Sequence, residues 1–386
     1  MIKSIVFVIT TKGTGKGGHF YSLATTAKAL QIRYDVHIIN IGCQLSPVIE
    51  GSGVPCTYIK SNFHDQLFVT YRLVKAIKKI RPDIIHAFDY IAYLMAFGAA
   101  RKCKLQLALT KCGGPTIKNY PYANNLIVYT KEDYVYYQSV TNAAETQIAL
   151  ISNRVTPFQI DNKRVSALRA LLNLQDKRVI LRIGRIGSYI ATAKQCVNMV
   201  RAFHKIDDRF VLVFIGFVDN QKSYEKLKEE TSEDSFIHFV TDKKYTLNSK
   251  ELLDVGEIVV GTGRSFMEAC YLGKKVMAPN QGQKYPVLVT SDNFDNVFYY
   301  NFSERYSEIN SKSGSDLLAS ITNCSIDTHQ WFELFFSSEQ IESLYTSFYK
   351  HLKPVNYGKI SNDIRWKILY LGLSNIKWLR TICGKR

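Results

Sequence analysis

The stretch "EIVVGTGRSFMEACYLGKKVMAP", residues 257–279, contains the pattern that decides the fold. An apolar run leads into a turn at Gly261, Thr262 and Gly263, which is followed by the helical run "SFMEACYLG" and a second apolar run, "KVMAP". A strand, a tight turn, a helix and a further strand form the unit from which parallel sheets are built. The stretch therefore predicts an α/β protein with helices packed on a parallel sheet.

The same alternation continues along the whole chain. One set of strand-like runs extends from "SIVFVIT" through "DIIHAF" to "NLIVYT", and a second begins at "RVILRIG" and "FVLVFIG". A polar segment between the sets places a boundary near Arg154. We predict two tandem Rossmann-like doubly wound domains, residues 1–153 and 154–352, facing a central cleft, and a basic tail at 353–386. Sheets of this kind bind ligands at the carboxyl ends of their strands.

Composition narrows the class of protein. A chain of 386 residues suits two domains, and its formal net charge of +17 favours an anionic partner such as a phosphorylated molecule or an acidic membrane. Nucleic acid is disfavoured because the basic residues do not gather with aromatics on a recognition module. The eight cysteines show no C-x-x-C spacing, so we expect no metal site. No leader or membrane-spanning run is apparent, and we expect a cytoplasmic protein.

The glycine-rich stretch "TKGTGKGGHFYSL", residues 11–23, follows the first strand. Its glycines match G-x-G-x-x-G, but the second strand ends in Asn40, where a nicotinamide site needs an acidic residue for the ribose. A triphosphate-binding loop is excluded because Lys16 is followed by Gly17 and not by Ser or Thr. What remains is a basic turn whose Gly17 and Gly18 lead into a helix that can attract an anion, or a plain strand-to-helix turn.

Three charged residues of the second domain are candidates for binding a nucleotide. Arg185 lies just beyond a strand and Lys194 near a helix start, so together they suit a diphosphate, although either alone fits a solvated surface charge. Glu268 lies one turn inside the helix after the glycine turn. Its carboxylate suits the paired hydroxyls of a ribose, with an ordinary helical glutamate as the alternative.

Several segments together resemble the GT-B glycosyltransferases of retaining family 4, which use nucleotide sugars. These segments are "GKGGHFYSLATTAKAL", "PDIIHAFD", "LTKCGGP", "ISNRV", "IGRIG" and "GTGRSFMEACYLGKKV". The resemblance covers roughly residues 2–352. It implies transfer of a sugar from a nucleoside diphosphate donor to a hydroxyl of a lipid-linked glycan, in surface polysaccharide synthesis such as that of capsule or O-antigen, with no cofactor and no metal.

The resemblance also implies roles for individual residues. Donor contacts are implied for Gly17, Arg185, Lys194, Gly261, Thr262, Gly263, Arg264 and Glu268, and the catalytic candidates are Gly18, His86, Asp89 and Lys111. Arg185, Lys194 and the amides of the glycine turn would neutralise the departing diphosphate. Two departures leave the donor sugar and the stereochemistry open, because Val260 and Cys112 stand where the family has a glutamate and a histidine.

The group that accepts the proton of the acceptor hydroxyl depends on the stereochemical outcome of the reaction. With retention, the leaving phosphate itself takes the acceptor proton; with inversion, Asp89 or His86 is the candidate base, unless His86 is only a packed strand-end histidine. Two other functions stay open. A nucleotide-sugar 2-epimerase has the same two-lobed fold, and a non-catalytic subunit would bind nucleotide sugar or glycan without reaction.

The basic tail combines cations with apolar and aromatic residues. Its eight Lys or Arg residues are interleaved with side chains such as Trp366 and Trp378. Such a segment suits an anionic membrane surface, which predicts peripheral attachment to the inner face of the cytoplasmic membrane. The alternative is a helix that crosses back to pack on the first domain.

Overall fold

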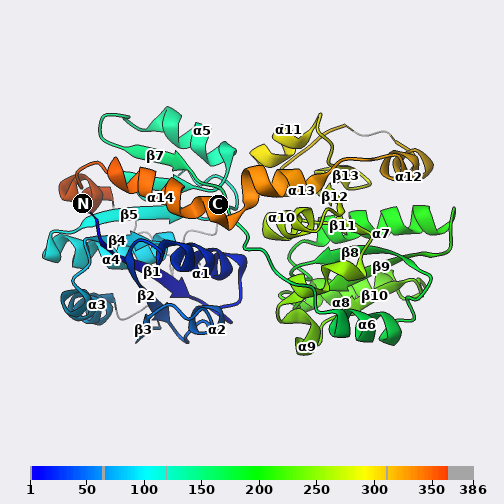
Figure 1. Ribbon diagram of the computed structural model, residues 1–386, viewed down its shortest axis with the longest axis horizontal. Helices are drawn as coiled ribbons and strands as arrows, with labels where there is room; N and C mark the ends of the chain where they lie inside the picture. The colour runs from blue at the N-terminus through cyan, green and yellow to red at the C-terminus, as the bar shows by residue number, and fades with distance from the viewer. Residues whose placement is uncertain (1, 63–65, 119, 310–311, 364–386) are drawn as a thin grey trace, which may run out of the picture. The chain divides into compact units, whose positions relative to one another are not determined.

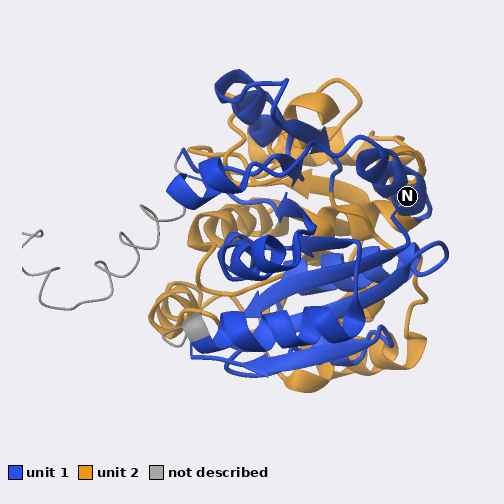
Figure 2. Cartoon of the chain, turned by 90° about the vertical axis from the view of Figure 1, so that its left-hand side faces the viewer, with its two compact units in different colours: residues 1–152, 339–386 blue, residues 153–338 orange. Residues whose placement is uncertain are grey.

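The chain forms two compact units in a computed structural model, which describes residues 2–62, 66–118, 120–309 and 312–363. Unit 1 comprises Met1–Ser152 and Glu339–Arg386, and unit 2 comprises Asn153–Ser338 (Figure 2). The sequence-based second domain runs to residue 352, so its last segment is corrected. Residues 339–363 pack with unit 1, because the helix Ile341–Lys350 covers the first sheet.

Unit 1 is built on a seven-stranded parallel sheet with strand order β3-β2-β1-β4-β5-β6-β7 (Figure 1). Its strands are β1 (Ser4–Thr11), β2 (Asp35–Gly42), β3 (Cys56–Lys60), β4 (Ile84–Ala87), β5 (Gln106–Lys111), β6 (Asn125–Val128) and β7 (Gln147–Leu150). Its helices are α1 (Gly18–Leu30), α2 (Pro47–Glu50), α3 (Gln66–Ile80), α4 (Tyr90–Cys103), α5 (Lys131–Val140) and α14 (Ile341–Lys350).

The central strand β1 shows why this sheet is covered on both faces. Val6 and Val8 pack into a cluster with residues of α3 and α4, whereas Ile5 and Phe7 pack into a second cluster with residues of α1 and α14. Successive side chains of a strand point to opposite faces, so a strand buried on both sides is an unbroken apolar run. This accounts for "IVFVI" in the sequence.

The C-terminal segment completes unit 1. Tyr345 of α14 is 1% exposed within the cluster that contains α1. Beyond this helix, Asn125 and Lys353 exchange two hydrogen bonds, and Ile360 is buried against the other face of the sheet. The first part of the predicted basic tail is therefore part of unit 1. Residues 364–386, which carry most of its cations, lie outside the described residues.

Unit 2 is built on a six-stranded sheet with strand order β10-β9-β8-β11-β12-β13, in which only the β12–β13 pair is antiparallel. Its strands are β8 (Arg178–Ile183), β9 (Phe210–Ile215), β10 (Ile237–Val240), β11 (Ile258–Val260), β12 (Lys275–Ala278) and β13 (Val287–Leu288). Its α-helices are α6 (Asn162–Leu171), α7 (Ile190–His204), α8 (Gln221–Glu230), α9 (Lys243–Thr246), α10 (Arg264–Tyr271), α11 (Phe294–Tyr299), α12 (Gly314–Thr322) and α13 (Thr328–Trp331).

Apolar clusters cover both faces of this second sheet as well. The α/β class with two doubly wound units is thus confirmed. Within the described ranges, no helix combines the length and the apolar character that crossing a bilayer requires.

Candidate functional site

The glycine loop of unit 1 is fixed by hydrogen bonds that involve Asn40 and Ser46. Ser46 Oγ donates to the Gly15 carbonyl at 2.6 Å, and a Cβ on Gly15 would lie 2.9 Å from the Ser46 backbone. Asn40, fully buried, donates to Thr11 Oγ1 at 2.7 Å and accepts from the Ser46 amide at 2.8 Å. Asn40 therefore fixes this loop through both polar atoms of its side-chain amide, and the strand β2 continues past it to Gly42.

Gly17 and Gly18 lie where this loop enters α1. Gly17 is the N-cap of the helix and Gly18 its first residue, and no side chain caps this end. A Cβ on Gly18 would meet nothing within 4 Å. An uncapped helix N-terminus offers backbone NH groups and a positive dipole end to an anion.

His86 is a packed histidine of the core. It lies in β4 with no exposed surface, Nδ1 is 2.8 Å from the Tyr349 hydroxyl, and Nε2 is 2.8 Å from Thr110 Oγ1. Burial lowers its pKa to about 3. Both ring nitrogens are occupied and the ring stays neutral, so the structure favours the packing alternative over a role as base.

Asp89 lies at the carboxyl end of the first sheet, where β4 passes into α4. Its carboxylate caps α4 by accepting from the Ala92 amide at 2.8 Å, and it accepts from the Thr10 amide at 2.7 Å and the Thr10 hydroxyl at 2.9 Å. Burial raises the pKa of this carboxyl, and the hydrogen bonds act against that rise. Asp89 thus remains a candidate base that also joins β1 to α4.

Lys111 forms an ion pair inside unit 1. Its Nζ lies 2.8 Å from Asp133 Oδ2, and the two side chains are 3% and 0% exposed. Thr116 and Thr130 also donate to the Asp133 carboxylate, at 2.9 and 2.8 Å. The pair satisfies two buried charges and ties the loop after β5 to α5, which is a structural role in place of the predicted catalytic one.

Cys112, which follows Lys111, is half-buried. Its Sγ lies 3.5 Å from the Phe88 carbonyl. Burial raises the pKa of the thiol to about 12, and Asp89 adds to the rise. The thiol is therefore protonated at neutral pH, and a nucleophilic role is disfavoured.

The glycine turn of unit 2 connects β11 to α10. Gly263 has φ of +49°, and a Cβ on Gly261 would lie 2.6 Å from the Phe266 backbone. Each backbone NH of the turn has a partner: Gly261 donates to the Met277 carbonyl at 2.9 Å, Thr262 to Ser265 Oγ at 3.0 Å, and Gly263 to the Asn301 carbonyl at 3.1 Å. All three NH groups are used to hold the turn, which does not favour the expectation that they bind the diphosphate.

Glu268 lies on α10, one turn beyond this glycine turn. It is 7% exposed, and its Oε1 accepts from Arg264 Nε at 2.8 Å. Arg264 also donates to the Arg154 carbonyl at 3.1 Å, which ties α10 to the segment at the start of unit 2. The carboxylate is therefore buried, and Arg264 holds it in position.

Arg185 and Lys194 have separate ion-pair partners. Arg185 lies in the loop after β8, where its Nη2 donates to the Tyr189 hydroxyl at 2.6 Å and its Nη1 lies 3.6 Å from Asp219 Oδ2. Lys194 Nζ lies 2.9 Å from the carboxylate of Glu230, the last residue of α8. Both cations are 46% exposed. The structure gives no contact that brings them onto one diphosphate.

Arg182, a basic residue within β8, was not predicted from the sequence as a site residue. Arg182, 4% exposed, lies three residues before Arg185, and its Nη1 is 3.4 Å from the Val260 carbonyl. The available signal was a charge inside the apolar run "RVILRIG". A loop that follows α11 was also missed, and it brings Asn301 to Gly263 and Glu304 to Thr192 at the start of α7.

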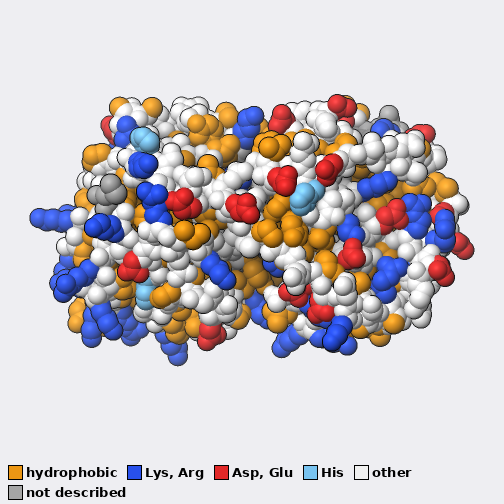
Figure 3. Space-filling view, in the orientation of Figure 1, with side chains coloured by type: hydrophobic (Ala, Val, Ile, Leu, Met, Phe, Trp, Pro, Cys, Tyr) orange, Lys and Arg blue, Asp and Glu red, His pale blue; other side chains and the backbone are white. Residues whose placement is uncertain are grey.

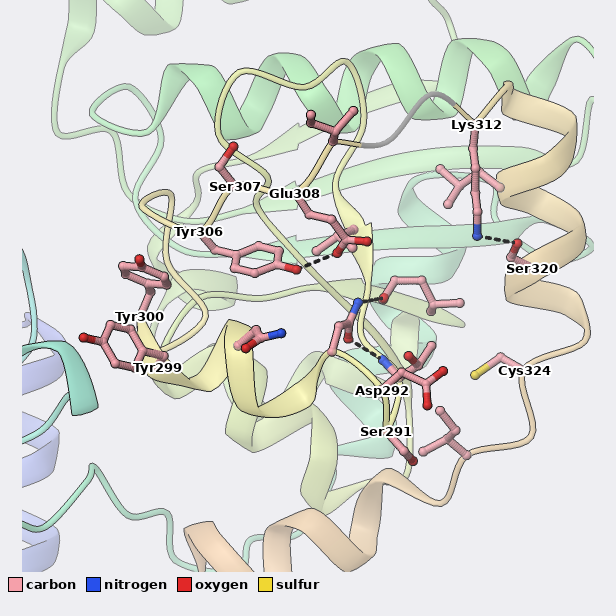
Figure 4. Close-up of a pocket in the computed structure, with 18 of the residues that line it drawn as sticks. Ser291, Asp292, Tyr299, Tyr300, Tyr306, Ser307, Glu308, Lys312, Ser320 and Cys324 are labelled. Atoms are coloured by element: carbon pink, nitrogen blue, oxygen red, sulfur yellow. Dashed lines mark hydrogen bonds between the residues drawn. The ribbon is translucent and has the colours of Figure 1, made fainter.

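A pocket of about 1310 Å³ lies elsewhere on unit 2, between β13, α11 and α12 (Figure 4). Tyr299, Tyr300 and Tyr306 line one part of it, and Lys312, which donates to Ser320, lies in another. None of the predicted site residues lines this pocket. It therefore does not locate the donor site.

Comparison with known proteins finds one matching family model and several solved structures of similar fold. Residues 14–151 match the family model described as Glycosyl transferase 4-like. No curated protein matches the sequence. Solved structures are similar over nearly the whole chain. Anabaena Alr3699/HepE, solved in complex with UDP and glucose, has a TM-score of 0.65 at 14% identity and covers 91% of this chain and 100% of its own.

Two further structures have the same fold. A glycosyltransferase from Rickettsia africae has a TM-score of 0.61 at 15% identity, with 100% of both chains covered. A UDP-GlcNAc 2-epimerase from Methanocaldococcus jannaschii has a TM-score of 0.58 at 14% identity, and covers 90% of this chain and 100% of its own. At such identities the likeness establishes the fold, which is that of the GT-B glycosyltransferases.

Proposed function

We propose that this protein is a glycosyltransferase that moves a sugar from a nucleoside diphosphate donor to a hydroxyl of a glycan, with a lipid-linked acceptor. The observation that carries the proposal is the position of Glu268, a nearly buried carboxylate just past the carboxyl end of β11 and next to a tightly held glycine turn. This is the edge at which doubly wound sheets bind nucleotides. Structures with the same fold have been solved with UDP and with UDP-glucose.

In this proposal Glu268 accepts hydrogen bonds from the ribose hydroxyls while Arg264 holds its Oε1 in place. Arg185 meets the diphosphate, since its exposed guanidinium lies in the loop directly after β8. Its positive charge stabilises the negative charge that develops on the departing diphosphate. The chain supplies this charge itself, so the proposed reaction needs no metal ion.

The proton of the acceptor hydroxyl can leave by two routes. In the retaining reaction that we propose, the departing phosphate accepts it. In an inverting reaction Asp89 is the remaining candidate base, because His86 is neutral and enclosed. The anomeric configuration of the product, measured by proton NMR, decides between the two.

A screen for ligands tests the proposal directly. Nucleoside diphosphates and their sugars should raise the melting temperature of the protein, and addition of a glycan acceptor should release nucleoside diphosphate in proportion to product. If no nucleoside diphosphate binds, the proposed function is wrong. Binding without any transfer to a range of acceptors would support the non-catalytic subunit.

An epimerase is the second candidate, because a UDP-GlcNAc 2-epimerase has the same fold over 90% of this chain. Such an enzyme would convert the donor with no acceptor present. Incubation of the protein with a nucleotide sugar alone, followed by NMR of the sugar, separates the two functions. A new sugar epimer would favour the epimerase, and an unchanged donor would favour the transferase.

Attachment to an anionic membrane is part of the proposal, and α3 supports it. The helix buries Leu73 and Ile77, and exposes Phe68 and Tyr71, which are 68% and 69% accessible. Its exposed cations are Arg72, Lys75, Lys78 and Lys79. Figure 3 shows Lys and Arg side chains gathered over the part of unit 1 in which α3 lies. Exposed aromatics beside cations suit the interface of an anionic bilayer.

A further inference from the structure

Arg182 is a buried cation at the ligand-binding edge of unit 2. Among the described residues of this unit it is the one Lys or Arg side chain that is buried, with 4% exposed. Lysine and arginine are rarely this buried unless an anion is paired with them. A nearby negative group is therefore expected to compensate the positive charge of Arg182.

The fold places this side chain between β8, β11 and α7. Arg182 is the penultimate residue of β8 and is in register with Phe214 of β9. It lies on the same face of the strand as Ile180, which packs with Cys196 of α7 and with Val260. Because Val260 ends β11, the contact of Nη1 with its carbonyl puts the guanidinium at the carboxyl edge of the sheet.

No carboxylate in the described part of the chain pairs with this guanidinium. Its single hydrogen bond there is the one to the Val260 carbonyl, at 3.4 Å, from a group that has five donors. Glu304, whose charge acts on the thiol of Cys196 in the same unit, accepts from the Thr192 hydroxyl at the start of α7. An almost buried charge without a counter-ion is unfavourable in the ligand-free protein.

The thiol of Cys196 shows that both charges are close by. Burial raises its pKa to about 11, while Arg182 acts to lower it and Glu304 to raise it. Both charges thus act on Cys196, and the described residues show no ion pair between the two. The amino end of α7, which begins at Ile190 with no side-chain cap, adds a positive dipole end to the same region.

We infer that Arg182 binds an oxyanion of the donor at the carboxyl edge of β8 and β11. The inference rests on the proposed function and deepens it, by adding a second cation to the exposed Arg185. A guanidinium fork matches the oxygens of a phosphate, and it matches a carboxylate equally well. The oxyanion thus comes from the donor diphosphate, or from an acidic group on the transferred sugar.

Isothermal titration calorimetry tests this with Arg182→Met, which removes the charge and keeps an apolar chain, and with Arg182→Lys, which keeps the charge without the fork. The probes are pyrophosphate, uridine, UDP, UDP-glucose and UDP-glucuronate. Arg178→Met is the matched control, because Arg178 begins the same strand and pairs with Glu257 at 2.6 Å. Melting temperatures are measured without ligand.

Arg182→Met should weaken pyrophosphate and UDP at least about tenfold, with uridine unchanged and Arg182→Lys intermediate. It should also keep or raise the melting temperature of the ligand-free protein, since it removes an unpaired buried charge. Arg178→Met should lower that temperature and leave all affinities unchanged. If only UDP-glucuronate is weakened by Arg182→Met, the oxyanion is the acid of the sugar.

Unchanged affinities for all five probes, with a lowered melting temperature, would overturn the inference and leave Arg182 a structural cation. That result would leave the proposed function intact if wild-type protein binds UDP. Conversely, loss of pyrophosphate binding in Arg182→Met, in a protein that binds no nucleotide, would support the oxyanion site and contradict the proposed function.

Discussion

Arg264 and Glu268 lie one turn apart on α10, with Arg264 Nε donating to Glu268 Oε1 at 2.8 Å and both side chains nearly buried. The arginine is itself fixed by the Arg154 carbonyl. A carboxylate held in this way loses little freedom when a ligand arrives, which favours binding through preorganisation.

Replacement of Glu268 tests its role toward the ribose. Glu268→Ala should weaken UDP binding by about 1–3 kcal/mol, because a charge-assisted hydrogen bond is lost. Glu268→Gln, which keeps one acceptor oxygen, should lose less. Calorimetry measures both, with Glu233→Ala on the exposed surface of unit 2 as the control. Equal affinity of wild type and Glu268→Ala would remove this residue from the site.

The separate partners of Arg185 and Lys194 predict unequal effects on binding. Arg185→Met should reduce the preference for UDP over UMP by about tenfold, since one guanidinium contact to the second phosphate is lost. Lys194→Met should change that preference much less, because its ammonium is paired with Glu230 on α8. Calorimetric titrations of both nucleotides give the ratio. Equal losses for the two variants would show that Lys194 leaves Glu230 to meet the diphosphate.

The Lys111–Asp133 pair should contribute to the stability of unit 1. Lys111→Met leaves the fully buried carboxylate of Asp133 without its cation, so the free energy of unfolding should fall by about 3–5 kcal/mol. The double variant Lys111→Met/Asp133→Asn should be more stable than that single variant, because no unpaired charge remains. Urea unfolding followed by far-UV circular dichroism measures each value. A strictly additive double variant would show that the two side chains are not coupled.

His86 should make unit 1 sensitive to acid. Its folded-state pKa is about 3 against an ordinary 6.5, so between these values the unfolded chain binds a proton that the folded chain excludes. The stabilising contribution is present above pH 6.5 and is lost as pH falls, by about 1.4 kcal/mol per unit or about 2 kcal/mol at pH 5. His86→Gln, which does not titrate, should show a correspondingly shallower fall in urea unfolding. The same slope for both proteins would contradict the assignment.

Membrane attachment should depend on α3 and on residues beyond Asp363. Lys75→Glu/Lys78→Glu/Lys79→Glu should reduce sedimentation with anionic liposomes, and high salt should reduce sedimentation of the wild type. A chain ending at Asp363 tests the contribution of the tail alone. It lacks residues 364–386 but keeps the hydrogen bond from the Tyr122 amide to Asp363. Exposed Lys243→Glu/Lys244→Glu in unit 2 is the control. Undiminished sedimentation of the α3 variant and of the shortened chain would exclude both segments.

Local patterns in the sequence were sufficient for the buried strands of both sheets, because a strand buried on both faces has to be apolar throughout. The edge strands β3, β7 and β13 were not predicted. The patterns could not show which sheet a helix covers. The apolar face of α14, which includes Tyr345, follows unit 2 in the chain and yet packs in unit 1. The sequence also could not show in which direction each helical side chain points. The ion-pair partner of Lys194 depends on the direction in which its side chain leaves α7.

The positions of candidate site residues were predictable where they depend on neighbours in sequence. Glu268 and its glycine turn belong to this class, because turn and helix lie in one stretch. Partners that are distant in the sequence could not be predicted. The Gly263 amide donates to the Asn301 carbonyl, and Lys111 forms an ion pair with Asp133. The contacts of the glycine-turn amides and of Lys111 therefore favour structural roles for groups that the sequence had suggested as site residues.

The two-segment composition of unit 1 has a consequence for biosynthesis. When residues up to 152 have left the ribosome, the sheet is complete in sequence, but the surface that Tyr345 and Tyr349 will cover is still bare. Translation of the intervening unit 2 takes on the order of ten seconds or more. Unit 2, a single continuous segment, is therefore free to fold first, and nascent unit 1 has to wait for the last helix with an exposed apolar face that chaperones recognise.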